Sequence, residues 1–228
     1  MIKITKLNKI FNENTKKEFH ALKDINIEIK TSSCVILKGV SGSGKSTLLS
    51  IIGTLLKPTS GDIKIDDESI AKLPDLHASN FRAKKLGFIF QSYNLFNELN
   101  VKDNVSIPLI PLGYSQKRID DMSKTALTLA NIEHKKDELV YNLSGGEKQV
   151  CNLCMAFAMH EALTASKGIN LAFLDEVFES LSSDNIELVI NLIKHIFNGK
   201  SLFLITHHDS LPLSNTKILQ VEKIKGLS

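Results

Sequence analysis

A glycine-rich segment at positions 39–47 has the residue types and spacing of a phosphate-binding loop. It reads Gly-Val-Ser-Gly-Ser-Gly-Lys-Ser-Thr, follows the apolar stretch Cys34–Lys38 and precedes Ser46–Leu56, which has the length of a helix. Glycines let backbone N–H groups turn toward phosphate oxygens, and a helix N-terminus adds positive partial charge at the same place. Lys45 supplies a cation for the β- and γ-phosphates, and the Ser46 hydroxyl is placed to bind magnesium. The predicted nucleotide-binding residues are Gly39, Ser41, Gly42, Ser43, Gly44, Lys45, Ser46 and Thr47.

Two adjacent carboxylates form the second feature with chemical potential. Asp175 and Glu176 follow the apolar stretch Asn170–Leu174, which predicts a strand that ends in both acids. A parallel sheet presents ligands to a crevice at the C-terminal edge of its strands, so we expect these acids at such an edge. Asp175 would then hold magnesium, and Glu176 would orient or deprotonate the attacking water. An isolated Asp-Glu pair is often two exposed acids that cap the next segment, but beside a phosphate-binding loop the functional interpretation is favoured.

The third feature is the sequence Leu-Ser-Gly-Gly-Glu-Lys-Gln at positions 143–149. Ser144 can cap a helix, while Gly145 and Gly146 permit the backbone to approach an anion closely. Alone, this motif is compatible with an ordinary helix start. Because it stands between the glycine-rich loop and the carboxylate pair, the chain resembles the ABC ATPases. The resemblance implies that this signature faces the γ-phosphate of ATP bound by the other subunit, in a homodimer or an ABC-type heterodimer.

The resemblance assigns roles to two further side chains. Gln91, directly after Leu86–Phe90, matches the glutamine that reaches magnesium and the attacking water in these ATPases. His207, after Ser201–Thr206, matches the switch histidine that contacts the γ-phosphate, and His208 is the weaker candidate because the family places this histidine directly after serine or threonine. The implied catalytic residues are Glu176, His207 and Gln91, and the implied magnesium ligands are Ser46, Gln91 and Asp175.

An aromatic residue near the N-terminus is a candidate for the base of the nucleotide. Phe11 stands where transporter members of the family keep an aromatic side chain that stacks on adenine. Stacking requires only a π face, so phenylalanine can replace the usual tyrosine. The alternative is that Phe11 belongs to the core face of a strand.

The hydrophobic pattern predicts the elements that position these residues. Alternating residues at Ile2–Leu7 and Ala21–Ile29 predict an antiparallel β layer, and Ser92–Tyr141 predicts an inserted helical segment. Apolar strands that alternate with helices predict a largely parallel sheet. We expect strands at 34–38, 61–65, 86–90, 170–174 and 201–206, and helices at 46–56, 144–166 and 184–197. The expected fold is α/β, a P-loop NTPase of ABC type, with 1–228 as a single ABC ATPase domain and 92–165 as its helical subdomain.

Composition narrows the class of protein. The chain has 228 residues, of which 43% are hydrophobic and 23% charged, as in soluble globular proteins. Its apolar runs fall short of the roughly 20 residues that a membrane-spanning helix requires, and its first residues lack a signal-peptide pattern. Cys34, Cys151 and Cys154 are expected to be reduced, and the C-x-x-C pair lacks the second ligand pair that zinc needs. We expect a cytoplasmic protein that, as the resemblance implies, lies peripherally at the inner face of the cell membrane.

The resemblance divides between two branches of the family. Residues 1–149 resemble transporter ATPases of the lipoprotein-release and macrolide-export branch. After Gln149 the pattern changes, because Val150 stands where transporters have arginine and Ser182 stands at the place of the customary D-loop aspartate. Residues 150–228 look more like SMC-like DNA-repair ATPases.

Two functions follow, with a mosaic of the two as a third possibility. The first is the ATP-hydrolysing subunit of a transporter, which works with membrane permease subunits. The second is an SMC-like DNA-repair or chromosome-organising ATPase, which would bind DNA, and the net charge of +3 does not decide between them. SMC-like members insert a very long coiled coil between the loop of this glutamine, the Q-loop, and the signature, whereas the span from Gln91 to Ser144 is short and shows no sustained heptads. This span favours transport, and the transported substrate cannot be read from a motif.

Overall fold

Two sheets and several helices make up the protein, whose computed structural model describes residues 1–89, 95–167, 171–178, 181–196, 200–206 and 216–222. The antiparallel sheet has the strand order β2-β1-β4-β5. Its strands are β1 (Ile2–Phe11), β2 (Phe19–Ile29), β4 (Ser60–Ile65) and β5 (Glu68–Ser69). β1 and β2 form one long hairpin whose last pair in the register is Phe11 with Phe19.

The parallel sheet has the strand order β6-β7-β8-β3-β9. Its strands are β3 (Cys34–Lys38), β6 (Leu86–Ile89), β7 (Leu171–Asp175), β8 (Ser201–Ile205) and β9 (Thr216–Gln220). β3 lies between β8 and β9, and Leu37 is paired with Ile205 on one side and with Leu219 on the other. All pairs in this sheet are parallel, so the strands β3, β7 and β8 are buried on both faces and read as apolar runs.

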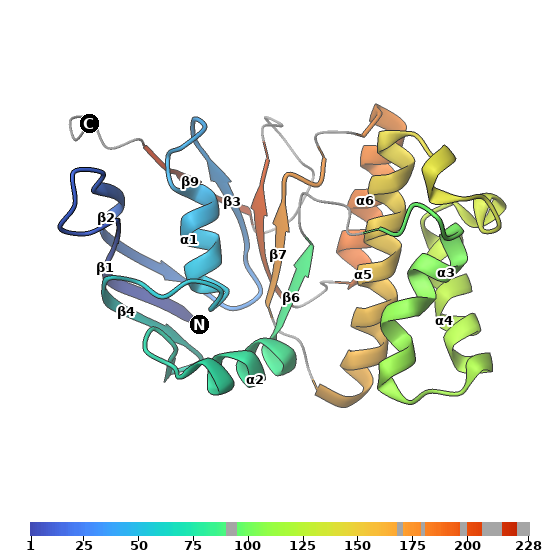
Figure 1. Ribbon diagram of the computed structural model, residues 1–228, viewed down its shortest axis with the longest axis horizontal. Coiled ribbons are helices and arrows are strands. Elements are labelled where there is room, and N and C mark those ends of the chain that lie inside the picture. Colours follow the sequence, from blue (N-terminus) through green and yellow to red (C-terminus); the bar gives the residue numbers. More distant parts are fainter. Residues whose placement is uncertain (90–94, 168–170, 179–180, 197–199, 207–215, 223–228) are drawn as a thin grey trace.

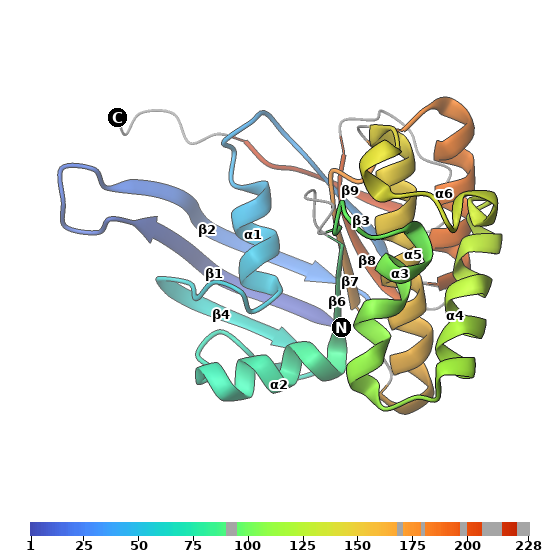
Figure 2. The same ribbon diagram turned by 45° about the vertical axis from the view of Figure 1, so that its right-hand side comes forward.

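The central strands β3, β7 and β8 each contribute to two hydrophobic cores, because successive side chains point to opposite faces. Val35 and Leu37 belong to the core that includes β1, β4 and α1 (Lys45–Ile52). Cys34 and Ile36 belong to the other core, with helices α5 (Gly145–Lys167) and α6 (Ser183–Ile196). Figures 1 and 2 show this layering, with α1, α2 (Asp75–Lys85) and the antiparallel sheet on one side of the parallel sheet and α3 (Val101–Ser106), α4 (Gln116–Leu129), α5 and α6 on the other.

The helices beside α5 form what we call the helical arm, residues 95–142. It contains α3, α4 and the short 3-10 turns Ile107–Leu112, Glu133–Lys135 and Val140–Asn142. Tyr114 donates its hydroxyl to the Ala162 carbonyl of α5 at 2.8 Å, which fixes the arm to that helix. No helix in the described ranges is both long and apolar enough to cross a membrane.

The cysteines are packing residues in this arrangement. Cys151 and Cys154 are fully buried in α5, and Cys154 Sγ donates to the Ala126 carbonyl at 3.5 Å. Burial raises the pKa of the Cys151 thiol to about 12, so it stays protonated at neutral pH. All three cysteines of the chain are free thiols in the structure.

The expected fold class is confirmed, since a parallel sheet, an antiparallel sheet and helices are all present. Three elements were not expected: α2, β9 and the two-residue strand β5. α2 has few apolar residues, and of its described side chains only Ala78 and Phe81 are buried hydrophobics, while β9 is a mostly exposed edge strand. Neither segment therefore carries the hydrophobic period that reveals a helix or a strand in a sequence. α1 ends at Ile52, earlier than expected, because Gly53 forms its C-cap.

Candidate nucleotide site

The glycine-rich loop lies between β3 and α1, and its shape requires glycine at two positions. Gly39 has φ of +152°, and a Cβ there would lie 2.1 Å from the Val221 carbonyl oxygen. Gly44, the N-cap of α1, has φ of +101°, and a Cβ there would lie 2.6 Å from the Ala21 carbonyl oxygen. Any side chain at either position would clash with backbone atoms, so both positions require glycine. The loop is thus held between β2 on one side and the end of β9 on the other.

Lys45 places its ammonium inside the curve of the loop. Its Nζ donates to the carbonyl oxygens of Gly39 at 2.7 Å and Val40 at 3.1 Å, and the residue is only 7% exposed. The cavity beside it has a volume of about 200 Å³ and is lined by residues 41–47 and Glu176. A buried cation next to an open cavity and the N-terminus of a helix is an arrangement that binds anions.

The two carboxylates lie at the C-terminal edge of the parallel sheet. Asp175 is the last residue of β7 and pairs with Ile205 of β8. Glu176 has φ of +52°, and its N–H donates to the Ile205 carbonyl at 3.0 Å, so the chain turns out of the sheet at this residue. Glu176 lines the same cavity as the glycine-rich loop, which brings residues from distant parts of the sequence together.

Asp175 is electrostatically linked to both neighbours. Burial raises the pKa of the Asp175 carboxyl above its ordinary value, and the charge of Glu176 raises it further. Lys45 acts in the opposite direction, since its positive charge lowers that pKa. The cluster therefore has two carboxylates for one ammonium, and its charge balance favours another cation in their vicinity.

The signature residues lie apart from this cavity. Ser144 precedes α5, and Gly145 and Gly146 begin it. α5 packs on the face of the parallel sheet that is opposite to α1 (Figures 1 and 2). None of these three residues is among those that line the cavity of the glycine-rich loop. Within one chain, the structure therefore does not bring the signature to the phosphate-binding loop.

Ser144 caps α5 in a reciprocal arrangement with Glu147. Its N–H and its hydroxyl each donate to Glu147 Oε2 at 2.8 Å, and the Glu147 N–H donates back to Ser144 Oγ at 3.3 Å. Lys135, from the helical arm, reaches Glu147 Oε1 at 2.8 Å. The Ser-x-x-Glu spacing is a capping-box signal in the sequence. The Lys135 contact has no such signal, because it depends on how the arm packs.

Phe11, Gln91 and His207 are the remaining candidate residues. Phe11 ends β1, is partly buried and has Lys9 Nζ 5.0 Å from its ring centroid. It is not among the residues that line the cavity of the glycine-rich loop. Gln91 and His207 lie outside the described residues, although the buried Thr206 directly precedes His207.

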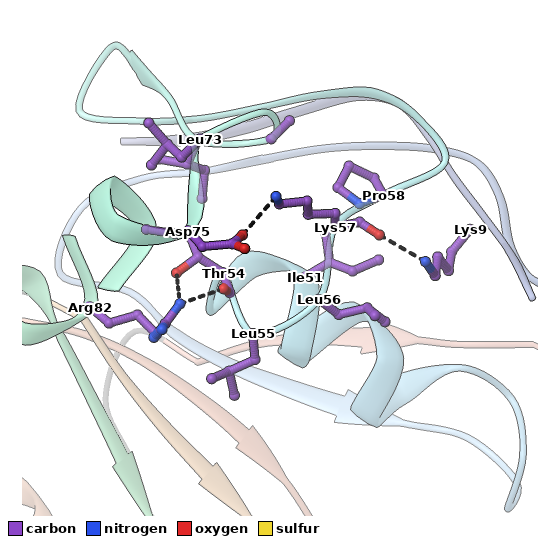
Figure 3. Close-up of a pocket in the computed structure, with 13 residues that line it drawn as sticks. Lys9, Ile51, Thr54, Leu55, Leu56, Lys57, Pro58, Leu73, Asp75 and Arg82 are labelled. Carbon is purple, nitrogen blue, oxygen red and sulfur yellow. Dashed lines mark hydrogen bonds and ion pairs between the residues drawn. The ribbon is translucent and has the colours of Figure 1, made fainter. Parts of the chain in front are cut away.

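A second cavity, of about 470 Å³, lies near the end of α1 and the start of α2 (Figure 3). Arg82 donates to the Thr54 carbonyl at 2.7 Å, and Lys57 pairs with Asp75 at 2.7 Å. Lys9 Nζ donates to the Lys57 carbonyl at 2.9 Å. These contacts join α2 to the end of α1. The polar groups named here already have hydrogen-bond or ion-pair partners within the protein.

Comparison with known proteins agrees with this arrangement. A family model described as ABC transporter matches residues 22–176. The macrolide export ATP-binding/permease protein MacB of Mannheimia succiniciproducens is 32% identical over 97% of the chain, and the methionine import ATP-binding protein MetN of Vibrio vulnificus is 36% identical over 91%. The chain covers 33% of MacB and 58% of MetN, so it spans about a third to somewhat over half the length of these relatives.

Solved structures give the same result. The ATP-binding cassette MJ0796, in a dimeric post-hydrolysis state bound to ADP and Pi, superposes with a TM-score of 0.77 and 31% identity over 91% of this chain and 88% of that one. A second dimeric structure of MJ0796 has a TM-score of 0.79 and 29% identity over 99% of this chain and 97% of that one. These matches include residues after Gln149, so the SMC-like alternative gains no support. The chain belongs to the ABC transporter family.

Proposed function

We propose that the protein binds and hydrolyses ATP and thereby powers a transporter. The observation that carries this proposal is the single cavity in which the glycine-rich loop and Glu176 face each other. The loop supplies N–H donors and the Lys45 cation for phosphates, and Glu176 supplies a carboxylate for the attacking water. The transporter names of MacB and MetN support the coupling to transport.

The donor groups of the site fit Mg²⁺. Among the described residues, no group of three or more His, Cys, Asp or Glu side chains is arranged to hold a metal ion. Mg²⁺ instead prefers one or two protein oxygens together with water and substrate phosphates, and Ser46 and Asp175 offer such oxygens. Gln91 would be the third protein ligand. When bound, the ion would neutralise phosphate charge during hydrolysis.

Dimerisation would complete the site. Ser144, Gly145 and Gly146 lie across the sheet from Lys45, so only a second subunit can place a signature against the bound γ-phosphate. The dimeric structures of MJ0796 support a homodimer, and an ABC-type heterodimer would use the same geometry. Residues 92–165 would act as the helical subdomain that carries the signature.

Membrane permease subunits are the proposed partners. The helical arm exposes several large apolar side chains, among them Phe96 at 55%, Leu139 at 46% and Tyr141 at 74%. The segments that carry them are joined, because the Tyr141 N–H donates to the Asn97 carbonyl at 3.1 Å. Exposed apolar groups that lie together are typical of protein interaction sites. Docking on a permease through this surface would place the protein at the membrane.

Two substitutions test the catalytic assignment. Lys45→Ala should weaken ATP binding, whereas Glu176→Gln should leave binding intact and slow hydrolysis by roughly 100-fold or more, the usual contribution of a general base. Nucleotide affinity is measured by fluorescence titration and hydrolysis by phosphate release. The matched control is Glu187→Gln on the exposed side of α6, which removes the same charge and should change neither quantity. Wild-type turnover in Glu176→Gln would refute the assignment.

A further inference from the structure

Glu147 is an ionised acid at the helix end that faces ATP in the proposed dimer. It accepts from the Ser144 N–H and hydroxyl at 2.8 Å each. The hydrogen bond from Lys135, together with those from Ser144, lowers the pKa of Glu147 to about 2. Glu147 is therefore a carboxylate at neutral pH, and it occupies the N-terminus of α5, where a helix favours an anion.

This carboxylate competes with the γ-phosphate in two ways. The Ser144 hydroxyl has one proton to donate, so it cannot donate to Glu147 and to a phosphate oxygen at once. The negative charge of Glu147 would also repel the phosphate at short range. ATP-driven closure therefore needs a group that keeps Glu147 partnered and offsets its charge when Ser144 turns to the nucleotide.

We propose that Lys135 is this group, a positioning residue that holds Glu147 and offsets its charge so that Ser144 can bind the γ-phosphate of the partner subunit. The proposal rests on the composite ATP site proposed above. Lys135 Nζ lies 2.8 Å from Glu147 Oε1, the oxygen that Ser144 does not use, so the ion pair survives when the Ser144 hydroxyl leaves. Glu138 holds Lys135 from the other side at 3.3 Å.

Geometry distinguishes Lys135 from the other lysine close to the signature. Lys148 Nζ donates to the Tyr141 carbonyl at 3.5 Å, whereas Lys135 Nζ forms the ion pair with Glu147. Lys135 comes from the 3-10 turn Glu133–Lys135 of the helical arm. A movement of the arm would therefore change the charge at the signature. In this way Lys135 links the position of the arm to ATP affinity across the dimer interface.

The test measures ATP-driven dimerisation by sedimentation velocity, in full-length protein that also carries Glu176→Gln. Lys135→Met should raise the ATP concentration for half-maximal dimerisation by roughly five- to tenfold, at the low end of typical coupling between sites. Lys135→Arg, which keeps the charge, should behave like the parent. Adding Glu147→Gln to Lys135→Met should restore dimerisation, because the amide has no charge to neutralise.

Controls separate this role from a structural one. Lys102→Met removes an ion pair of the same length, 2.8 Å to Asp120, elsewhere in the helical arm, and should leave dimerisation unchanged. If Lys135→Met merely loosened the arm, Glu147→Gln would not rescue it, and that result overturns the proposal. Parent-like dimerisation of Lys135→Met overturns it as well. A parent that fails to dimerise with ATP refutes the composite site itself, and the role of Lys135 falls with it.

Discussion

Lys45 shows how a single side chain prepares the site for phosphate. The ammonium has three N–H donors, and two of them are bonded to the carbonyl oxygens of Gly39 and Val40. One donor is left for a phosphate oxygen without the loss of either bond. The backbone carbonyls thus hold the cation in position before the nucleotide arrives, which lowers the entropic cost of binding.

Phe11 is the residue whose two interpretations are easiest to separate. If its ring stacks on adenine, Phe11→Ala should weaken ATP binding by about 1–3 kcal/mol, the usual value of stacking between a base and an aromatic side chain. Phe19→Ala is the matched control, since Phe19 is the cross-strand partner of Phe11 and is 41% exposed. Nucleotide affinity is measured by calorimetry. Equal affinities of both variants would assign Phe11 to strand packing.

Glu147 should also make the free energy of unfolding depend on pH in the acid range. Its pKa is lowered from 4.5 to about 2 in the folded state, so its ionised form stabilises the fold above about pH 4.5. This contribution should fade as the pH falls from about 5 to about 2, because the carboxylate is then protonated. The measurement is the difference in the free energy of unfolding between wild type and Glu147→Gln over this range. A difference that stays constant with pH would contradict the assigned pKa.

At the level of elements, the sequence predicts best where one segment contains the whole signal. β3, the glycine-rich loop and α1 follow one another, so their pattern shows both the loop and its surroundings. The strand that ends in Asp175 and Glu176 is equally clear, because an apolar run stops at two acids. α2 and β9 lack a hydrophobic period, and the pairing of Lys135 with Glu147 arises only when the arm packs against α5. Such features depend on tertiary structure.

The start of α5 allows a direct test of the composite site. Ser144→Glu should weaken ATP-driven dimerisation in the Glu176→Gln protein at least about tenfold, because opposed like charges cost several kcal/mol at an interface. ATP binding to the separate subunit should survive, since the cavity of the glycine-rich loop does not include Ser144. Sedimentation with MgATP and with MgADP provides the measurement.

A second helix supplies the control for that experiment. Ser115 is the N-cap of α4, and its side chain accepts from the Arg118 N–H. Ser115→Glu makes the same change at a helix start that no proposed interface uses, so it should alter stability without altering dimerisation. Dimerisation that is equally strong with ADP, or insensitive to Ser144→Glu, would exclude the composite mechanism.

At the scale of the whole molecule, the two hydrophobic cores support different parts of the site. One core supports α1 and the glycine-rich loop, while the other supports α5 and the helical arm, and the parallel sheet separates them. A partner that presses on the arm can therefore affect the signature while the phosphate loop keeps its shape. This division suits a protein that has to convert nucleotide state into movement at a partner.

The permease interface can be tested on the surface of the arm. Tyr141→Asp should weaken pull-down of the cognate permease about tenfold or more if this exposed ring is an anchor, because buried aromatic anchors dominate such interfaces. Ile218→Asp is the matched control, since Ile218 is also exposed, at 55%, but lies on edge strand β9. ATP hydrolysis of the isolated protein should be unchanged in both variants. Equal permease binding by the two variants would exclude this surface.

The order of the strands has a consequence for biosynthesis. β3, which leads into the glycine-rich loop, is paired in the sheet only with β8 and β9, and both are encoded far downstream. While the ribosome translates the intervening segments, this apolar strand has neither of its neighbours, and pairing of such distant segments is slow. The loop also passes close to the carbonyl oxygen of Val221, directly after β9. The nascent chain therefore acquires a finished phosphate-binding loop only after β9 has been translated, and until then the apolar strand β3 lacks both of its neighbours in the sheet and is prone to aggregation.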